Sequence, residues 1–265
     1  MADFATRFAG LKAELDDPGA AFWGENMGTG AERMRNALLA LVPDIPDRVA
    51  EARLFRELAV LTAKGGERAC LDHADRALAA QDATGALPAD QLYFMHWLCG
   101  EASAAWDCDP RTDMHLDRAL ALHAALGRPL VETFFLRQYR GVHERACGRP
   151  RLGLDSFEPL LADIDRHHGL VLNDVLRLMA ESEERLCHVD RAMAYAERRV
   201  RQLDGVKDPN LKVEAMGALA RLHARAGRLA LAERLLEDAI VVADGSGLPL
   251  VRQLARAQKL GIVSG

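Results

Sequence analysis

The chain has 265 residues, a formal net charge of −5, and 49% hydrophobic and 28% charged residues, which is typical of a globular rather than a disordered protein. A general nucleic-acid binder normally carries a basic excess, so the charge argues against direct nucleic-acid binding. No apolar run reaches the roughly 18 residues of a membrane span, and the N-terminus lacks the basic and apolar segments of a signal peptide. The 5 cysteines show no CxxC spacing and favour reduced thiols, so we expect a cytoplasmic protein.

The first part of the chain, residues 1–50, shows two helical patterns at 4–15 and 31–42. A Gly- and Pro-containing segment at 17–30 joins them. We expect two N-terminal helices here. The pattern is open to interpretation as a degenerate repeat with a long loop.

From residue 51 to 246, apolar residues recur at helical spacing and glycines divide them at regular intervals. Gly85, Gly127 and Gly169 lie 42 residues apart, as do Gly205 and Gly247. A glycine ends a helix in a left-handed cap, and a following Pro suits the first turn of the next helix. Ala, Leu and Arg, which are strong helix formers, are abundant. The pattern therefore predicts helix pairs that repeat along the chain.

The clearest repeat runs from residue 213 to 246, with a turn at Gly227. Ala220 and Ala232 are small enough to let its two helices approach closely. The bulky side chains that fill the space against neighbouring units are Leu219, Leu236 and Ile240.

The spacing of these residues resembles the tetratricopeptide repeat (TPR), although Met216, His223 and Asp244 stand where the family has Trp, Tyr and Pro. The resemblance covers residues 51–246, as about five TPR-like units. It implies an all-α, right-handed α-solenoid of antiparallel helix pairs, with about a dozen helices in a single continuous domain. Residues 247–265 would form the C-terminal capping helix. The 42-residue interval exceeds the roughly 34 residues of the common TPR. It resembles the long-helix variants found in MalT-like bacterial regulators and kinesin light chains.

The unit between residues 131 and 169 fits the repeat least well, because the family register would bury Arg137 and Arg140. An alternative apolar stripe at helical spacing consists of Phe135, Tyr139, Val142 and Ala146. Hydrophobic periodicity is the primary signal of secondary structure. We therefore predict that this stripe is the apolar face of the helix.

In the TPR family, the first helix of each unit lines the inner, concave face. The resemblance therefore implies a partner-binding face, whose residues here are Phe55, Phe94, Trp97, Glu101, Gln138, Arg145, Arg177, Glu181, Glu184, Arg221 and Arg225. Aromatic and arginine side chains dominate the binding energy of many interfaces. Phe94 and Trp97 are also open to interpretation as core residues.

The spacing of Ser, His and acidic residues shows no catalytic constellation. We therefore expect a non-enzymatic adaptor or scaffold that binds a protein or peptide, without a cofactor and without a membrane. One alternative is a regulatory sensor that binds a small peptide or metabolite in the concave groove. Another is a metal-binding protein or enzyme that uses the carboxylates and imidazoles of Asp163–His168 or Glu181–His188. A homo-oligomer is compatible with all three.

Overall fold

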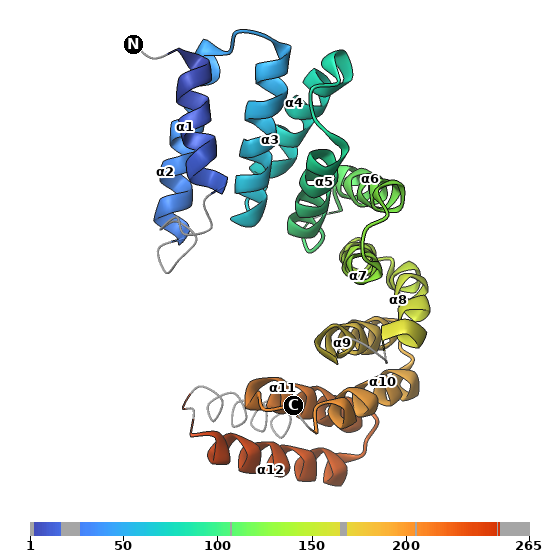
Figure 1. Ribbon diagram of the computed structural model, residues 1–265. Coiled ribbons are helices and arrows are strands. Elements are labelled where there is room, and N and C mark those ends of the chain that lie inside the picture. Colours follow the sequence, from blue (N-terminus) through green and yellow to red (C-terminus); the bar gives the residue numbers. More distant parts are fainter. Residues whose placement is uncertain are drawn as a thin grey trace. The chain divides into compact units, whose positions relative to one another are not determined.

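The computed structural model describes residues 3–16, 27–106, 108–164, 169–204, 206–247 and 249, and within these ranges it is all-helical (Figure 1). A short 3-10 helix, η2, spans Val42–Asp44. The twelve α-helices of the described residues are α1 (Phe4–Asp16), α2 (Met27–Leu39), α3 (Arg48–Lys64), α4 (Ala69–Thr84), α5 (Ala89–Ser103), α6 (Pro110–Leu126), α7 (Leu130–Ala146), α8 (Pro150–Ile164), α9 (Gly169–Arg185), α10 (Val189–Gln202), α11 (Pro209–Arg225) and α12 (Leu229–Ser246). The predicted all-α fold is confirmed. No helix among the described residues is long and apolar enough to cross a membrane.

The chain divides into two compact units, residues 1–146 and residues 147–265. In the first unit, α3 packs against α4 and α5, and α5 packs against α6 and α7. In the second unit, α9 packs against α8 and α10, and α11 packs against α10 and α12. The turns within these pairs are short, and short connections make neighbouring helices antiparallel.

Glycines lie at the ends of several helices, and aspartates lie at the beginnings. Gly85 and Gly127 adopt left-handed backbone conformations, with φ of 63° and 60°, directly after α4 and α6. Only glycine takes up this conformation without steric cost, so the prediction of glycine caps is confirmed at both places. At the opposite ends, the side chains of Asp109 and Asp208 accept hydrogen bonds from the first turns of α6 and α11. Each aspartate therefore supplies a partner for an otherwise unpaired N–H group.

The buried face of α7 differs from the predicted stripe. Its buried residues are Phe134, Leu136, Gly141, His143 and Glu144. Phe135, Tyr139 and Val142 are only half-buried, and Ala146 is exposed. The prediction is wrong because Phe135 and Tyr139 face α5, where they contact Trp97 and Glu101. The helical spacing of Phe135 and Tyr139 therefore reflects a contact of α7 with the preceding first helix, α5.

The α11–α12 pair packs as its small residues predict. Ala220 and Ala232 are both fully buried and belong to one core cluster together with Leu236. A methyl group is therefore all that the close approach of these helices accommodates at position 232.

Replacing Ala232 with Leu is expected to lower the free energy of unfolding by about 1–3 kcal/mol, because the added atoms overpack this contact. Ala230→Leu is the matched control, since Ala230 lies on the same helix and is exposed. Denaturation with urea, followed by circular dichroism, measures both. Equal midpoints for the two variants would contradict this packing.

The cysteines differ in oxidation state. Cys70, Cys99 and Cys187 carry free thiols, whereas Cys108 and Cys147 are disulfide-bonded. The prediction of reduced thiols is therefore wrong for these two, because spacing along the sequence does not report the oxidation state of a thiol. Disulfides are rare in cytosolic proteins, so the cysteines no longer support the predicted cytoplasmic location.

Two predicted elements lie outside the described residues. The expected capping helix within 247–265 is described only at residues 247 and 249, and the expected loop at 17–30 only from residue 27. The proposed metal ligands of Asp163–His168 also lie largely outside the described part, since 165–168 and the side chain of Asp163 are not described.

Candidate functional site

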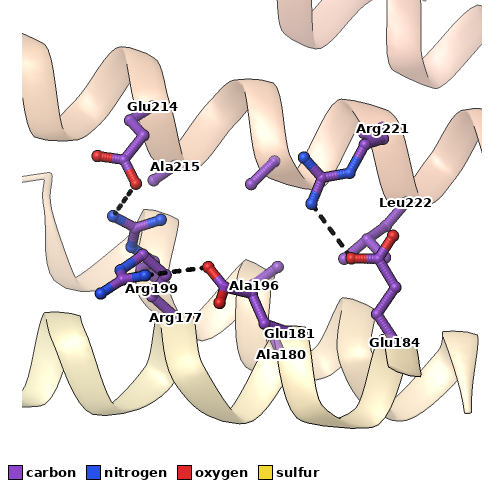
Figure 2. Close-up of a pocket in the computed structure, with 11 residues that line it drawn as sticks. Arg177, Ala180, Glu181, Glu184, Ala196, Arg199, Glu214, Ala215, Arg221 and Leu222 are labelled. Atoms are coloured by element: carbon purple, nitrogen blue, oxygen red, sulfur yellow. Dashed lines mark hydrogen bonds and ion pairs between the residues drawn. The ribbon is translucent and has the colours of Figure 1, made fainter. Parts of the chain in front are cut away.

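A cavity of about 120 Å³ lies among α9, α10 and α11 in the second unit (Figure 2). Its lining combines three arginines, three glutamates and five apolar side chains. These residues are Arg177, Arg199, Arg221, Glu181, Glu184, Glu214, Ala180, Ala196, Ala215, Ala218 and Leu222. The volume corresponds to about four water molecules at roughly 30 Å³ each. The cavity is thus of the size of one amino-acid side chain.

Small residues create this space. Ala180 on α9, Ala196 on α10 and Ala215 on α11 are all buried, and each places only a methyl group against the cavity. Larger apolar side chains at these positions would fill it. Leu222 adds a fourth buried apolar group from α11. The apolar part of the lining therefore comes from all three helices.

Arg199 lines the cavity with a guanidinium group that is almost fully buried, with 2% of the residue exposed. Its Nε donates a hydrogen bond to Oδ1 of Asn173 at 2.9 Å. One terminal nitrogen donates to Glu214 at 3.2 Å, and the side chain of Glu214 is 47% exposed. A buried charge is costly unless it is paired. The two hydrogen-bond partners of Arg199 are the neutral amide oxygen of Asn173 and the half-exposed carboxylate of Glu214.

The remaining charges pair between and along α9 and α11. Arg177 donates to Glu181 at 3.0 Å on α9. Glu184 accepts hydrogen bonds from Arg221 at 3.2 Å and from Arg225 at 2.5 Å, both from α11. Burial would raise the pKa of the Glu184 carboxyl, but the hydrogen bonds and charges of the two arginines outweigh it and hold the pKa below its usual value. Glu184 therefore stays ionised and links the first helices of two consecutive pairs.

Of the residues predicted for the binding face, five lie together in the second unit. Arg177, Glu181, Glu184 and Arg221 line the cavity, and Arg225 binds Glu184. Figure 2 shows Arg177, Glu181, Glu184 and Arg221 around the cavity.

The alternative of a metal site at Glu181–His188 is not supported by the positions of these side chains. Glu181 and Glu184 are bonded to arginines of α9 and α11. His188 instead bonds through Nδ1 to the buried Glu183 at 2.8 Å. Among the described residues, the three predicted ligands do not form a group close enough to hold one metal ion.

In the first unit, the two predicted aromatic residues of α5 are Phe94 and Trp97. Phe94 is 37% exposed, and the amine of Lys64 lies 5.7 Å from the centre of its ring. Trp97 is half-buried between Tyr93 and Phe135, with ring centroids 5.6 Å and 6.4 Å away. Phe94 is therefore the more accessible of the two aromatic rings, and Trp97 is packed on two sides.

The other predicted residues of the first unit differ in exposure. Glu101 accepts a hydrogen bond from the hydroxyl of Tyr139 at 2.5 Å. Gln138 and Arg145 are half-buried on α7. Phe55 is 2% exposed, and the guanidinium of Arg76 lies 3.8 Å from its ring centre. The structure thus places Phe55 in the core, with Arg76 over its ring.

Three polar residues of the cavity region are missing from the predicted set: Asn173, Arg199 and Glu214. Arg199 lies on α10, the second helix of its pair, and the family register places only first helices on the inner face. One sequence signal could have revealed it. Arg199 falls on the same buried stripe of α10 as Ala192 and Ala196, and an arginine on an apolar stripe is seldom buried without a partner.

The fold is similar to that of NprR, solved as a complex of NprR with its cognate peptide NprX. The TM-score is 0.56 at 11% sequence identity, and the match covers 100% of this chain and 73% of the NprR chain. No family model matches the sequence, and no curated protein matches it. At this identity the similarity shows the fold alone. Together with the helix pairs described above, it identifies a TPR-like helical-repeat fold, an α-solenoid of antiparallel helix pairs.

Proposed function

We propose that this chain is a non-enzymatic module that binds a peptide, either free or as a segment of a partner protein, on the inner face of its first helices. The observation that carries the proposal is the cavity among α9, α10 and α11, which is the size of one side chain and is bordered by paired charges. The similarity to NprR, whose structure holds a bound peptide, supports this choice among the functions that such a fold can carry.

We further propose that the chain belongs to the long-helix variants of the TPR, such as those of MalT-like regulators and kinesin light chains. Successive first helices α3, α5, α7, α9 and α11 begin 39 to 41 residues apart. The common TPR repeats every 34 residues or so. Longer first helices give each unit a wider inner face, which suits an extended peptide.

Affinity selection of a synthetic random heptapeptide library, read by mass spectrometry, tests the proposal. We expect the wild-type protein to enrich a set of related heptapeptides. Arg221→Ala should lower their affinity by roughly thirtyfold, the usual effect of removing an interface anchor. It should melt like wild type, because Arg221 is exposed and Glu184 keeps its second partner, Arg225.

Arg201→Ala is the control for a lost positive charge, since Arg201 is exposed on α10 and does not line the cavity. It should bind the selected peptides as wild type does. Selection of no peptide by the wild-type protein would overturn the proposed function. Equal loss of affinity in both variants would show that charge, and not this cavity, determines binding.

A further inference from the structure

Two free thiols meet in the core of the first unit. Cys70 lies on α4 and Cys99 on α5, and both residues are fully buried. The Sγ atom of Cys99 lies 3.8 Å from the carbonyl oxygen of Cys70, and a hydrogen bond joins the two thiol groups. A single buried cysteine usually acts as a small apolar side chain. Two thiols in contact can in addition form a disulfide.

The two thiols differ in acidity. The hydrogen bond from Cys99 is the main reason that the pKa of Cys70 lies below its usual value. The backbone N–H of Leu71 and the charge of Arg111 act in the same direction, whereas burial and Asp72 oppose them. The same hydrogen bond, together with burial, holds the pKa of Cys99 well above its usual value. Because the thiolate is the nucleophilic form of cysteine, Cys70 is the more reactive sulfur, and Cys99 is the thiol that keeps its proton.

The position of Cys70 gives an oxidant a route to its sulfur. Cys70 is the second residue of α4, where the positive end of the helix dipole stabilises a thiolate. The N-cap residue is Arg68, whose side chain has no acceptor and makes no capping hydrogen bond. Gly65 and Gly66 precede it. A helix start without a side-chain cap is less stable than one with a cap, so the first turn of α4 can open locally and admit a small molecule.

We propose that Cys70 and Cys99 form a redox-active dithiol that hydrogen peroxide converts into a disulfide between α4 and α5, with Cys70 as the attacking sulfur. The structure contains the pair in its reduced form. This inference concerns the first unit and does not depend on the proposed peptide binding.

The reaction has two steps. The thiolate of Cys70 attacks one oxygen of hydrogen peroxide. An S–O bond forms as the O–O bond breaks, and the hydroxide that leaves takes up the proton released by the thiol. The sulfur of Cys99 then attacks the sulfenic acid of Cys70. An S–S bond forms as the S–O bond breaks, and the hydroxyl group leaves as water with the proton of the Cys99 thiol. The dithiol thus loses two hydrogen atoms, and the peroxide becomes two molecules of water.

Peptide mapping after peroxide treatment tests the proposal. The Cys187→Ser variant is used, because Cys187 is exposed and carries a further free thiol. The folded protein is treated with hydrogen peroxide, quenched with catalase and digested without reductant. We expect a linked pair of peptides that contains residues 70 and 99, lacks two hydrogen atoms and separates on treatment with dithiothreitol. The same protein unfolded in guanidinium is the control. Burial alone would protect both thiols, so we expect faster linkage in the folded protein only if the pair is reactive.

Two further variants, both made in the Cys187→Ser protein, assign the roles of the sulfurs. In Cys99→Ala the reaction should stop at the sulfenic acid of Cys70, which gains one oxygen atom and is trapped with dimedone. In Cys70→Ala no dimedone should attach to Cys99. Dimedone on Cys99 but not on Cys70 would overturn the assignment of Cys70 as the attacking sulfur.

Absence of the linked peptides from the folded protein, or slower linkage than in the unfolded protein, would overturn the dithiol itself. This comparison leaves both core cysteines in place, so it decides the proposal even if Cys70→Ala or Cys99→Ala does not fold.

Discussion

Lowering the pH from 7 to 5 is expected to cost this protein about 3 kcal/mol of its free energy of unfolding, through a buried pair of histidines in the first unit. His96 on α5 and His115 on α6 are both buried, and their Nδ1 atoms lie 2.8 Å apart. One ring must donate and the other accept, so the bond exists only while at least one ring is neutral.

Burial is the main reason that both rings stay neutral. It lowers the pKa of His96 to about 3, with the charges of His115 and Arg118 acting in the same direction. It lowers the pKa of His115 to about 4, where Arg111 adds to the effect and Asp109 opposes it. Both values lie below the usual pKa of 6.5. The unfolded chain therefore takes up two protons as the pH falls below about 6.5, while the folded chain does not until about pH 4.

The stabilisation is accordingly complete above pH 6.5 and is lost as the pH falls towards 4. Guanidinium denaturation at pH 7, 6 and 5 measures it. The double variant His96→Gln, His115→Gln is the control, since glutamine side chains can hydrogen-bond but do not titrate. We expect the double variant to lose much less stability than wild type between pH 7 and pH 5. Equal pH dependence of the two proteins would show that other groups are responsible.

Replacing Trp97 with Ala is expected to lower the free energy of unfolding by about 3 kcal/mol, at the lower end for a tryptophan truncation because the residue is only half-buried. The ring packs between Tyr93 and Phe135, and its Nε1 is buried without a hydrogen bond among the described residues. Its loss leaves a gap between α5 and α7.

Trp97→Phe separates packing from any role in binding. Phenylalanine keeps an aromatic ring between the same neighbours, so most of the stability should remain when unfolding is followed by circular dichroism in urea. A Trp97→Ala variant that melts like wild type would show that Trp97 belongs to the binding face alone. The sequence left both interpretations open, and the two ring contacts favour the core.

The helix pairs and their ends are predictable from sequence because they depend on local chemistry. Gly85 and Gly127 end helices through their own left-handed backbone conformation, and Ala220 and Ala232 are small enough for close helix packing. The predicted residues that line the cavity have another origin. The resemblance to the TPR family placed Arg177, Glu184 and Arg221 on the inner face of first helices, and all three line the cavity.

What the sequence did not reveal depends on contacts between helices. The stripe of Phe135 and Tyr139 has the period of a buried face, but its neighbours on α5 turn it into a lateral contact. The burial of Phe55 depends on Arg76 of the next helix lying over its ring. Arg199 enters the site because three alanines from three helices leave room beside it. Periodicity within one helix carries no information on any of these.

The contacts within each unit also determine how the chain folds. In the described part, the substantial contacts join helices that are at most two positions apart in chain order, such as α3 with α5 and α9 with α10. Contact order is therefore low, and proteins of low contact order fold quickly because little loop entropy is lost before a contact forms. Each helix pair can close soon after its second helix is synthesised. The carboxylate of Glu184 on α9, in contrast, has its arginine partners on α11. These ion pairs at the cavity therefore form only after α11 has joined α9 and α10.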